Sequence, residues 1–190
     1  MWQNDKIALA MIIKGEGEEH LRLRRALKSV RPYVDGAFIT ITGDPKKAKE
    51  TIAVCNEFDA VVSYTKALWT VDEASVKWLT EFFGYEPAIK VGDQLFLFDE
   101  ARNFNFSQVS RDYLWIIWMD SDDVLKQGEN LWKLKEIGRQ SNVEAFYLNY
   151  IYQADFDEQG NIKHIVIEHL RERVLRNEGK YKWIAPIHET

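Results

Sequence analysis

The chain has few of the features that mark secreted, membrane or low-complexity proteins. It contains one cysteine, four prolines and ten glycines in 190 residues, so no internal disulfide can form. Because the fold needs no oxidising compartment, we expect a cytoplasmic protein. The longest apolar runs, residues 7–13 and 113–119, are seven residues each, whereas a transmembrane helix needs about 20. We therefore expect no integral membrane segment.

The chain also has no large excess of charge of one sign. Its 30 acidic and 25 basic residues give a net charge of -5, which argues against nucleic acid as a partner. Hydrophobic residues make up 46% of the sequence, and a chain of this length buries roughly 70% of its unfolded surface. We expect one globular domain spanning residues 1–190, with a sizeable core.

Strands and helices alternate in the first third of the chain. The hydrophobic spacing predicts a strand, a helix, a strand, a helix beginning near Pro45 and a further strand, at residues 6–14, 18–30, 37–42, 45–55 and 60–64. This βαβαβ order implies a parallel sheet with helices on both faces. Such sheets bind ligands beyond the carboxyl ends of their strands.

The rest of the chain is less regular. Residues 65–98 interrupt the alternation with an aromatic-rich stretch that contains a predicted helix at 72–83, and we interpret them as an insertion. A helix from 99 to about 110 then precedes the most hydrophobic strand, 113–119. A further helix at 128–140 and two strands at 145–154 and 162–168, joined by a turn at 157–160, complete the prediction.

Three carboxylates follow the strand 113–119 within four residues, as Asp120-Ser121-Asp122-Asp123. Two like charges about 4 Å apart repel by roughly 1 kcal/mol in water and about 4 kcal/mol at an effective dielectric of 20, so a positive group is required nearby. Carboxylate oxygens suit Mg²⁺ or Mn²⁺, and such an ion can also bind phosphate oxygens. The alternative is a solvated turn that caps the next helix, but the sheet edge favours a ligand site.

Several further motifs occur in an informative order. They are Met11-Ile12-Ile13-Lys14 with Glu16, residues 30–35 (VRPYVD), Thr42-Gly43-Asp44, residues 101–104 (ARNF), residues 118–123 (WMDSDD), residues 173–177 (RVLRN), Trp183 and Ile187-His188-Glu189. Together they resemble family 2 glycosyltransferases with the GT-A fold, over nearly the whole chain apart from the insertion. The resemblance implies an α/β, Rossmann-type, mostly parallel sheet with a small C-terminal antiparallel section.

The resemblance also implies an activity. A sugar would pass, with inversion, from a nucleotide-sugar donor to a hydroxyl acceptor, which can be a saccharide, a lipid or a protein. Mn²⁺ or Mg²⁺ would bridge the donor diphosphate. The implied metal ligands are Asp122, Asp120 and His188, with Asp122 also counted as catalytic; the implied donor-binding residues are Lys14, Glu16, Thr42, Arg102, Asn103 and Asp120.

The general base and the nucleobase are less defined. Glu189 is a candidate base because it adjoins the closing motif, and Asp155, Asp157 and Glu158 are alternatives. Residues 157–160 are, however, more typical of a simple turn. Ile41 stands where many family members have an aspartate, which leaves the nucleobase open.

Two other functions and one structural question stay open at this point. The scaffold is also compatible with a non-catalytic nucleotide- or glycan-binding domain, and with a nucleotidyltransferase. The insertion's aromatic residues, Trp69, Trp78, Phe82, Phe83 and Tyr85, are expected to pack it onto the domain, with a sugar-stacking platform as the alternative.

Overall fold

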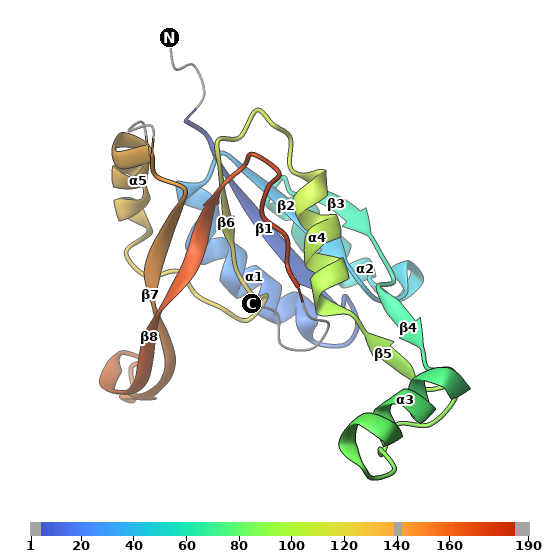
Figure 1. Cartoon of the computed structure of the whole chain (residues 1–190). Coiled ribbons are helices and arrows are strands. Elements are labelled where there is room, and N and C mark those ends of the chain that lie inside the picture. Colours follow the sequence, from blue (N-terminus) through green and yellow to red (C-terminus); the bar gives the residue numbers. More distant parts are fainter. Residues whose placement is uncertain (1–4, 139–141, 185–190) are drawn as a thin grey trace.

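The computed structural model describes residues 5–138 and 142–184, and its centre is a six-stranded sheet with the order β3-β2-β1-β6-β8-β7 (Figure 1). Four strands are parallel: β1 (Ile7–Ile13), β2 (Gly36–Ile41), β3 (Val61–Tyr64) and β6 (Trp115–Trp118). β8 (Ile162–Arg176) runs antiparallel to β6 and to β7 (Ala145–Phe156). The expected GT-A-like α/β fold is therefore confirmed, including the C-terminal antiparallel section.

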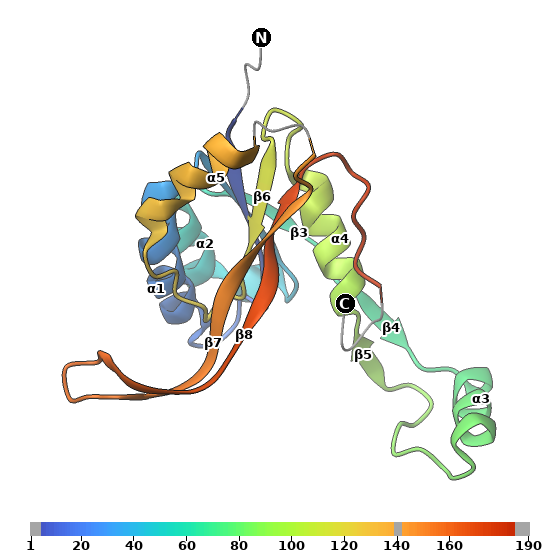
Figure 2. The same cartoon turned by 60° about the vertical axis from the view of Figure 1, so that its left-hand side comes forward.

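Helices cover both faces of the sheet. α1 (Glu19–Val30), α2 (Lys49–Glu57) and α5 (Leu131–Gly138) lie on one face, and α4 (Phe98–Gln108) lies on the other (Figure 2). β1 is buried at every position, because alternate side chains point into the two apolar layers. Three single-turn 3₁₀ helices complete the connections: η1 (Arg31–Tyr33), η2 (Pro45–Lys47) and η3 (Gly128–Asn130).

The insertion forms an arm that projects from the domain (Figures 1 and 2). Its base is a small antiparallel sheet of β4 (Leu68–Thr70) and β5 (Gln94–Phe96), which carries α3 (Glu73–Phe83). The helix prediction is confirmed: the Asp72 carboxylate accepts the Ser75 N–H at the N-terminus, and Gly84 ends the helix with φ of 73°. Strands of three residues are too short to produce a detectable pattern.

The expectation that the insertion's aromatic side chains pack it onto the domain is wrong. No residue of α3 is buried, and Trp78, Phe82, Phe83 and Tyr85 are each half or more exposed. Their rings contact one another in sequence, with centroids 5.0–5.7 Å apart. Because the arm extends away from the sheet, these side chains have no apolar layer to join.

The last strand is much longer than the sequence suggests. The prediction ended it at residue 168, but β8 continues to Arg176 and pairs with β6 through Ile116 and Ile117. Residues 177–184, here called the strap, then run back beside α4 toward the carboxyl ends of the parallel strands (Figure 1). Within the described residues, no helix combines the length and the apolar character needed to cross a membrane.

Candidate functional site

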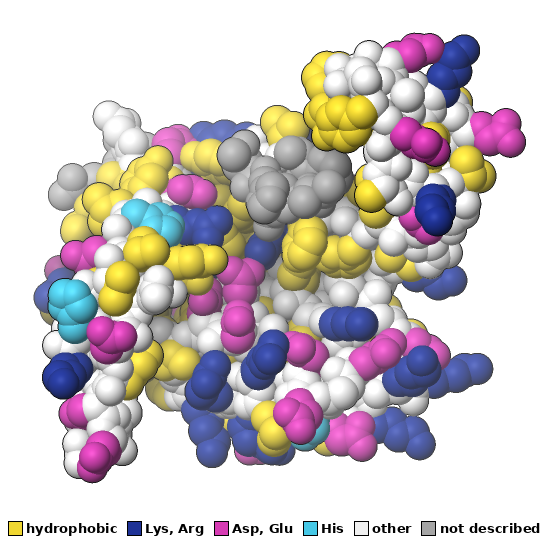
Figure 3. Space-filling model, turned by 90° about the horizontal axis from the view of Figure 1, so that it is seen from below, with side chains coloured by type: hydrophobic (Ala, Val, Ile, Leu, Met, Phe, Trp, Pro, Cys, Tyr) yellow, Lys and Arg dark blue, Asp and Glu magenta, His cyan; other side chains and the backbone are white. Residues whose placement is uncertain are grey.

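The carboxyl ends of β1, β2 and β6 lie side by side. Ile13 pairs with Ile41, and Ala10 pairs with Trp118, so the residues that follow each strand emerge at the same edge. Lys14 is exposed there, and Thr42 is fixed beside it by its N–H, which donates to the Ile13 carbonyl at 2.9 Å. Seen from this edge, acidic side chains lie centrally, between the β7–β8 hairpin and the insertion arm (Figure 3).

The turn after β2 closes tightly against the end of β1. The Asp44 N–H donates to the Glu16 carboxylate at 3.4 Å, which places Glu16 beside this turn. Gly43 lies so close to the Lys14 carbonyl oxygen that an added Cβ would clash with it. The structure therefore brings Lys14, Glu16 and Thr42 into one neighbourhood, and their role in binding the donor stays a prediction.

Asp120 is held by two arginines that come from different elements. Arg102 on α4 is buried and donates from Nη2 to Asp120 Oδ1 at 2.6 Å. Arg173 on β8 is 4% exposed, and its Nη2 lies 3.6 Å from Asp120 Oδ2. Burial acts to raise the pKa of Asp120, but the charge and hydrogen bond of Arg102, with Arg173 and Arg171, hold it below its usual range. Asp120 is therefore ionised and fixed in orientation at neutral pH.

Asp123 turns inward and closes the Asp120–Asp123 turn. Its Oδ2 accepts the Asp120 N–H at 3.0 Å and lies 3.2 Å from Arg173 Nη2, while its Oδ1 accepts the Tyr150 hydroxyl at 3.1 Å. Burial raises the pKa of Asp123, although Arg173 opposes this rise. Burial and the Asp123 charge raise the pKa of Tyr150 to about 12. Asp123 thus has a structural role in the turn.

Asp122 differs from its two neighbours because its side chain is exposed. Its carbonyl oxygen accepts from Arg25 Nη2 on α1 at 3.0 Å, which fixes the backbone of the turn. Of the three acids in the motif, Asp122 is the most exposed, whereas the side chains of Asp120 and Asp123 are 32% and 15% exposed.

Three guanidinium groups surround the indole ring of Trp118, and we call Arg102, Arg171 and Arg173 the arginine cluster. Their guanidinium carbons lie 4.7, 5.4 and 3.9 Å from the ring centroid. Arg173 also stacks on Tyr150 at 4.5 Å, so its guanidinium lies between two aromatic rings. The positive charge that the acidic motif requires is therefore supplied to Asp120 and Asp123 by arginine.

Reasoning from the sequence assigned no role to the side chains of Arg171, Arg173 and Tyr150. Arg173 belongs to the closing motif, but only the register of β8 against β6 brings it to Trp118. The close spacing of Arg171 and Arg173 was a usable signal, although an irregularity of the β7–β8 pairing at Arg173 breaks the simple alternation of faces there.

Asn103 anchors the strap to α4. Its Nδ2 donates to the Trp183 carbonyl at 2.9 Å, and its Oδ1 accepts the Trp183 N–H at 2.9 Å. The Trp183 ring packs against Trp118 with a centroid distance of 4.6 Å, and Arg102 lies 5.1 Å from it. The strap therefore leads from the far edge of the sheet to the neighbourhood of Asp120.

The remaining candidates fall into two groups. Asp157 accepts backbone N–H groups of Gln159 and Asn161, which lower its pKa, so the predicted turn is confirmed. His188 and Glu189 lie outside the described residues.

In the part of the chain that is described, no group of three or more His, Cys, Asp or Glu side chains converges in a way that could hold a metal ion. Binding of Mn²⁺ or Mg²⁺ stays a prediction.

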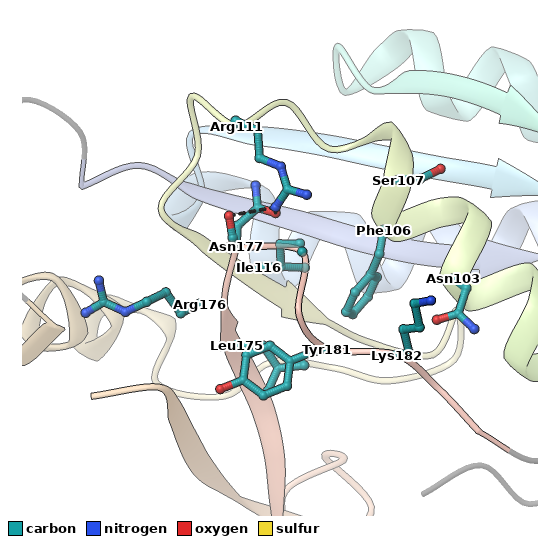
Figure 4. A pocket seen from close by; sticks show the side chains of 11 residues that line it. Asn103, Phe106, Ser107, Arg111, Ile116, Leu175, Arg176, Asn177, Tyr181 and Lys182 are labelled. Carbon is teal, nitrogen blue, oxygen red and sulfur yellow. Dashed lines mark hydrogen bonds between the residues drawn. The ribbon is translucent and has the colours of Figure 1, made fainter. Parts of the chain in front are cut away.

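A cavity of about 290 Å³ lies between α4, β6 and the strap (Figure 4). Apolar side chains of Phe106, Ile116, Leu175 and Tyr181 line it, and Arg111 donates to Asn177 at its border. Asn103 also borders this cavity, whereas Arg102, Arg171 and Arg173 are not among its lining residues.

Comparison with known proteins gives a likeness of fold. No protein-family model and no curated protein sequence matches the chain. The crystal structure of 4-diphosphocytidyl-2C-methyl-D-erythritol synthase from Anaerococcus prevotii DSM 20548 is similar with a TM-score of 0.50 at 8% identity, covering 92% of this chain and 71% of that one. A second structure of a synthase with this name is similar with a TM-score of 0.48 at 13% identity, covering 92% of this chain and 76% of that one. The crystal structure of S. aureus TarS 1-349 is similar with a TM-score of 0.45 at 9% identity, covering 90% of this chain and 47% of that one.

Proposed function

We propose that this chain is a metal-dependent glycosyltransferase, which moves a sugar from a nucleotide-sugar donor to a hydroxyl acceptor with inversion. The observation that carries the proposal is the acidic turn after β6. Asp120 is fixed in orientation and Asp122 is exposed, at the edge where β1 and β2 also end. Open α/β sheets bind their ligands at this edge.

The described residues have separable roles in this proposal. Lys14, Glu16 and Thr42 line the nucleoside end of the site. The ionised Asp120 accepts a hydrogen bond from a hydroxyl group of the nucleotide-sugar, since Arg102 holds the Asp120 carboxylate in one orientation. The positions of these residues support this assignment of roles. Lys14 and Thr42 follow β1 and β2, whereas Asp120 lies at the end of β6.

The metal would be held by Asp122, with Asp120 and His188 as further ligands. The carboxylate oxygens of Asp122 and Asp120 suit Mn²⁺ or Mg²⁺ better than softer metal ions. When bound, the ion supplies positive charge where the diphosphate leaves. Trp183, five positions before His188, is anchored beside Arg102, which supports a role for the closing motif at this site. Glu189 would take the proton of the acceptor hydroxyl.

A second candidate function is nucleotidyl transfer. The fold is shared with an enzyme whose name specifies a diphosphocytidyl product, and this supports a nucleotide substrate in either case. The two reactions differ in the group released. Sugar transfer from a nucleotide-sugar releases a nucleoside diphosphate, whereas nucleotidyl transfer from a nucleoside triphosphate releases pyrophosphate. A non-catalytic domain would bind its nucleotide and release neither.

The test is calorimetric titration of a nucleotide-sugar panel with and without Mn²⁺, followed by a measurement of donor hydrolysis. We expect metal-dependent binding with release of a nucleoside diphosphate. Asp122→Ala should abolish turnover and leave the fold intact. Asp112→Ala is the matched control, because Asp112 is an exposed aspartate at the opposite end of β6. Full activity of Asp122→Ala would sink the assignment, and pyrophosphate release from nucleoside triphosphates would favour the second candidate.

A further inference from the structure

We propose that the arginine cluster is an anion receptor and that Arg171 binds the diphosphate of the donor directly, without an intervening metal ion. The identity of the ligand rests on the proposed function. The receptor itself rests on the distribution of charge around Trp118. This division allows the two proposals to be tested separately.

The first observation is the balance of charge among the described residues around Trp118. Three guanidinium groups converge on the indole of Trp118, while two carboxylates, Asp120 and Asp123, make ion pairs with the cluster. Arg102 and Arg173 face these two carboxylates, whereas Arg171 makes no ion pair with any residue that the structure describes. Like charges held this close repel, most of all where water is partly excluded.

The second observation is the availability of Arg171. Among residues 5–138 and 142–184, its guanidinium makes neither a hydrogen bond nor an ion pair, and its side chain is partly exposed. It lies 5.4 Å from the Trp118 centroid and 5.5 Å from the Tyr150 centroid, which restricts where the group can move. A restricted guanidinium loses less conformational entropy when it binds a ligand.

The third observation is an unsatisfied donor beside it. Arg173 is almost fully buried, and its Nη2 has no hydrogen-bond partner of good geometry although Asp123 lies 3.2 Å away. The guanidinium groups of Arg171 and Arg173 both lie over the rings of Trp118 and Tyr150, so the two side chains lie on the same side of β8. Buried donors without partners are uncommon, and an ion bound beside the donor is one explanation for them.

The chemistry of this cluster suits a phosphate group. Guanidinium groups donate in a planar fork that matches phosphate oxygens, and they keep their charge in partly buried surroundings. The position also suits the diphosphate of the proposed donor. Arg171 lies on the same indole ring as Arg102 and Arg173, the two arginines that contact Asp120 at the carboxyl edge of the sheet. An arginine there would neutralise charge on the leaving diphosphate in addition to any metal ion.

The test uses inorganic pyrophosphate as the probe, titrated calorimetrically into the full chain in EDTA at low ionic strength. We expect binding that weakens as salt is added, at least a tenfold loss of affinity in Arg171→Gln, and a smaller loss in Arg171→Lys. Arg22→Gln is the matched control, because Arg22 is an exposed arginine on α1 whose partner is Glu19, and it should bind as wild type does. Equal urea midpoints would show that all variants are folded.

Two results would overturn the inference: equal pyrophosphate affinity in wild type and Arg171→Gln, or binding that occurs only when Mn²⁺ replaces EDTA. Failure of the proposed function is distinguishable. If no nucleotide-sugar is turned over but pyrophosphate binding still depends on Arg171, the receptor stands and the transferase proposal is lost. If sugars are transferred and Arg171→Gln retains both turnover and pyrophosphate binding, the receptor alone is lost.

Discussion

Replacing Arg173 by methionine should destabilise the domain strongly, because Asp123 would then lie in a partly closed site without its cation. The Arg173–Asp123 contact is 3.2 Å, and the side chains are 4% and 15% exposed. Removing one partner of such a pair costs about 3–5 kcal/mol. Asp120 adds little to this figure, since it is more exposed and keeps its hydrogen bond to Arg102.

The lower end of that range is the better expectation for Arg173→Met. The methionine side chain still packs on Trp118, and Asp123 keeps its hydrogen bonds to Tyr150 and to the Asp120 N–H. We expect a loss of about 3 kcal/mol in the free energy of unfolding, or roughly 6–12 °C in Tm for a domain of this size.

Urea unfolding at pH 7, followed by circular dichroism, measures this loss. The double variant Arg173→Met/Asp123→Asn removes the uncompensated charge and should recover at least about 1 kcal/mol. Asp122→Asn is the control, and its exposed side chain should change the free energy of unfolding by less than about 0.5 kcal/mol. The reasoning is refuted if Arg173→Met costs less than about 1 kcal/mol, or if the double variant recovers nothing.

Three further changes test other contacts of the site. The ionised Asp120 stabilises the fold fully above its ordinary pKa of 3.8, and this contribution is lost as pH falls through its lower pKa in the folded state. Asp120→Asn removes the contribution, so the difference in urea stability between the variant and wild type should shrink below about pH 4. A difference that is constant with pH would contradict this. Asn103→Leu should remove two hydrogen bonds to the Trp183 backbone, cost about 1–3 kcal/mol and speed amide exchange at Trp183; unchanged exchange would mean that packing alone holds the strap. Gly43→Ala should force the turn away from the Lys14 carbonyl and cost about 1–3 kcal/mol in urea unfolding, and wild-type stability would contradict the observed close approach.

The first half of the fold was predictable because each element has its own periodic pattern. The continuous apolar run of β1 and the helical spacing of Leu23, Ala26, Leu27 and Val30 both correspond to buried positions. The position of the acidic motif followed directly, since a fully apolar strand that stops at an aspartate must end at a sheet edge. These signals depend only on neighbours in sequence.

The end of β8 and the arginine cluster depend on contacts between distant residues. Arg173 and Arg176 interrupt the apolar pattern, yet both are buried, because their guanidinium groups stack on Trp118 and Trp115. A pattern that counts arginine as polar therefore ends the strand too early. The need for a cation near Asp120 was predictable from charge repulsion, but sequence spacing alone did not identify arginine from another strand as part of the answer.

The insertion shows a related limit. Its aromatic side chains suggested burial by composition, whereas the three-residue strands at its base carry α3 away from every apolar layer of the domain. Whether an aromatic residue is buried depends on what the chain places against it, and this is not encoded in the residue type.

A crystal structure of the chain grown with Mn²⁺ and a nucleotide-sugar, or its nucleoside diphosphate, tests the central claim most directly. We expect the nucleoside along the ends of β1 and β2 near Glu16, the metal bound to Asp122, and the diphosphate within hydrogen-bond distance of Arg171. A nucleotide bound elsewhere, or a nucleotide at this edge with no ion near Asp122, would contradict the proposed metal-dependent sugar transfer.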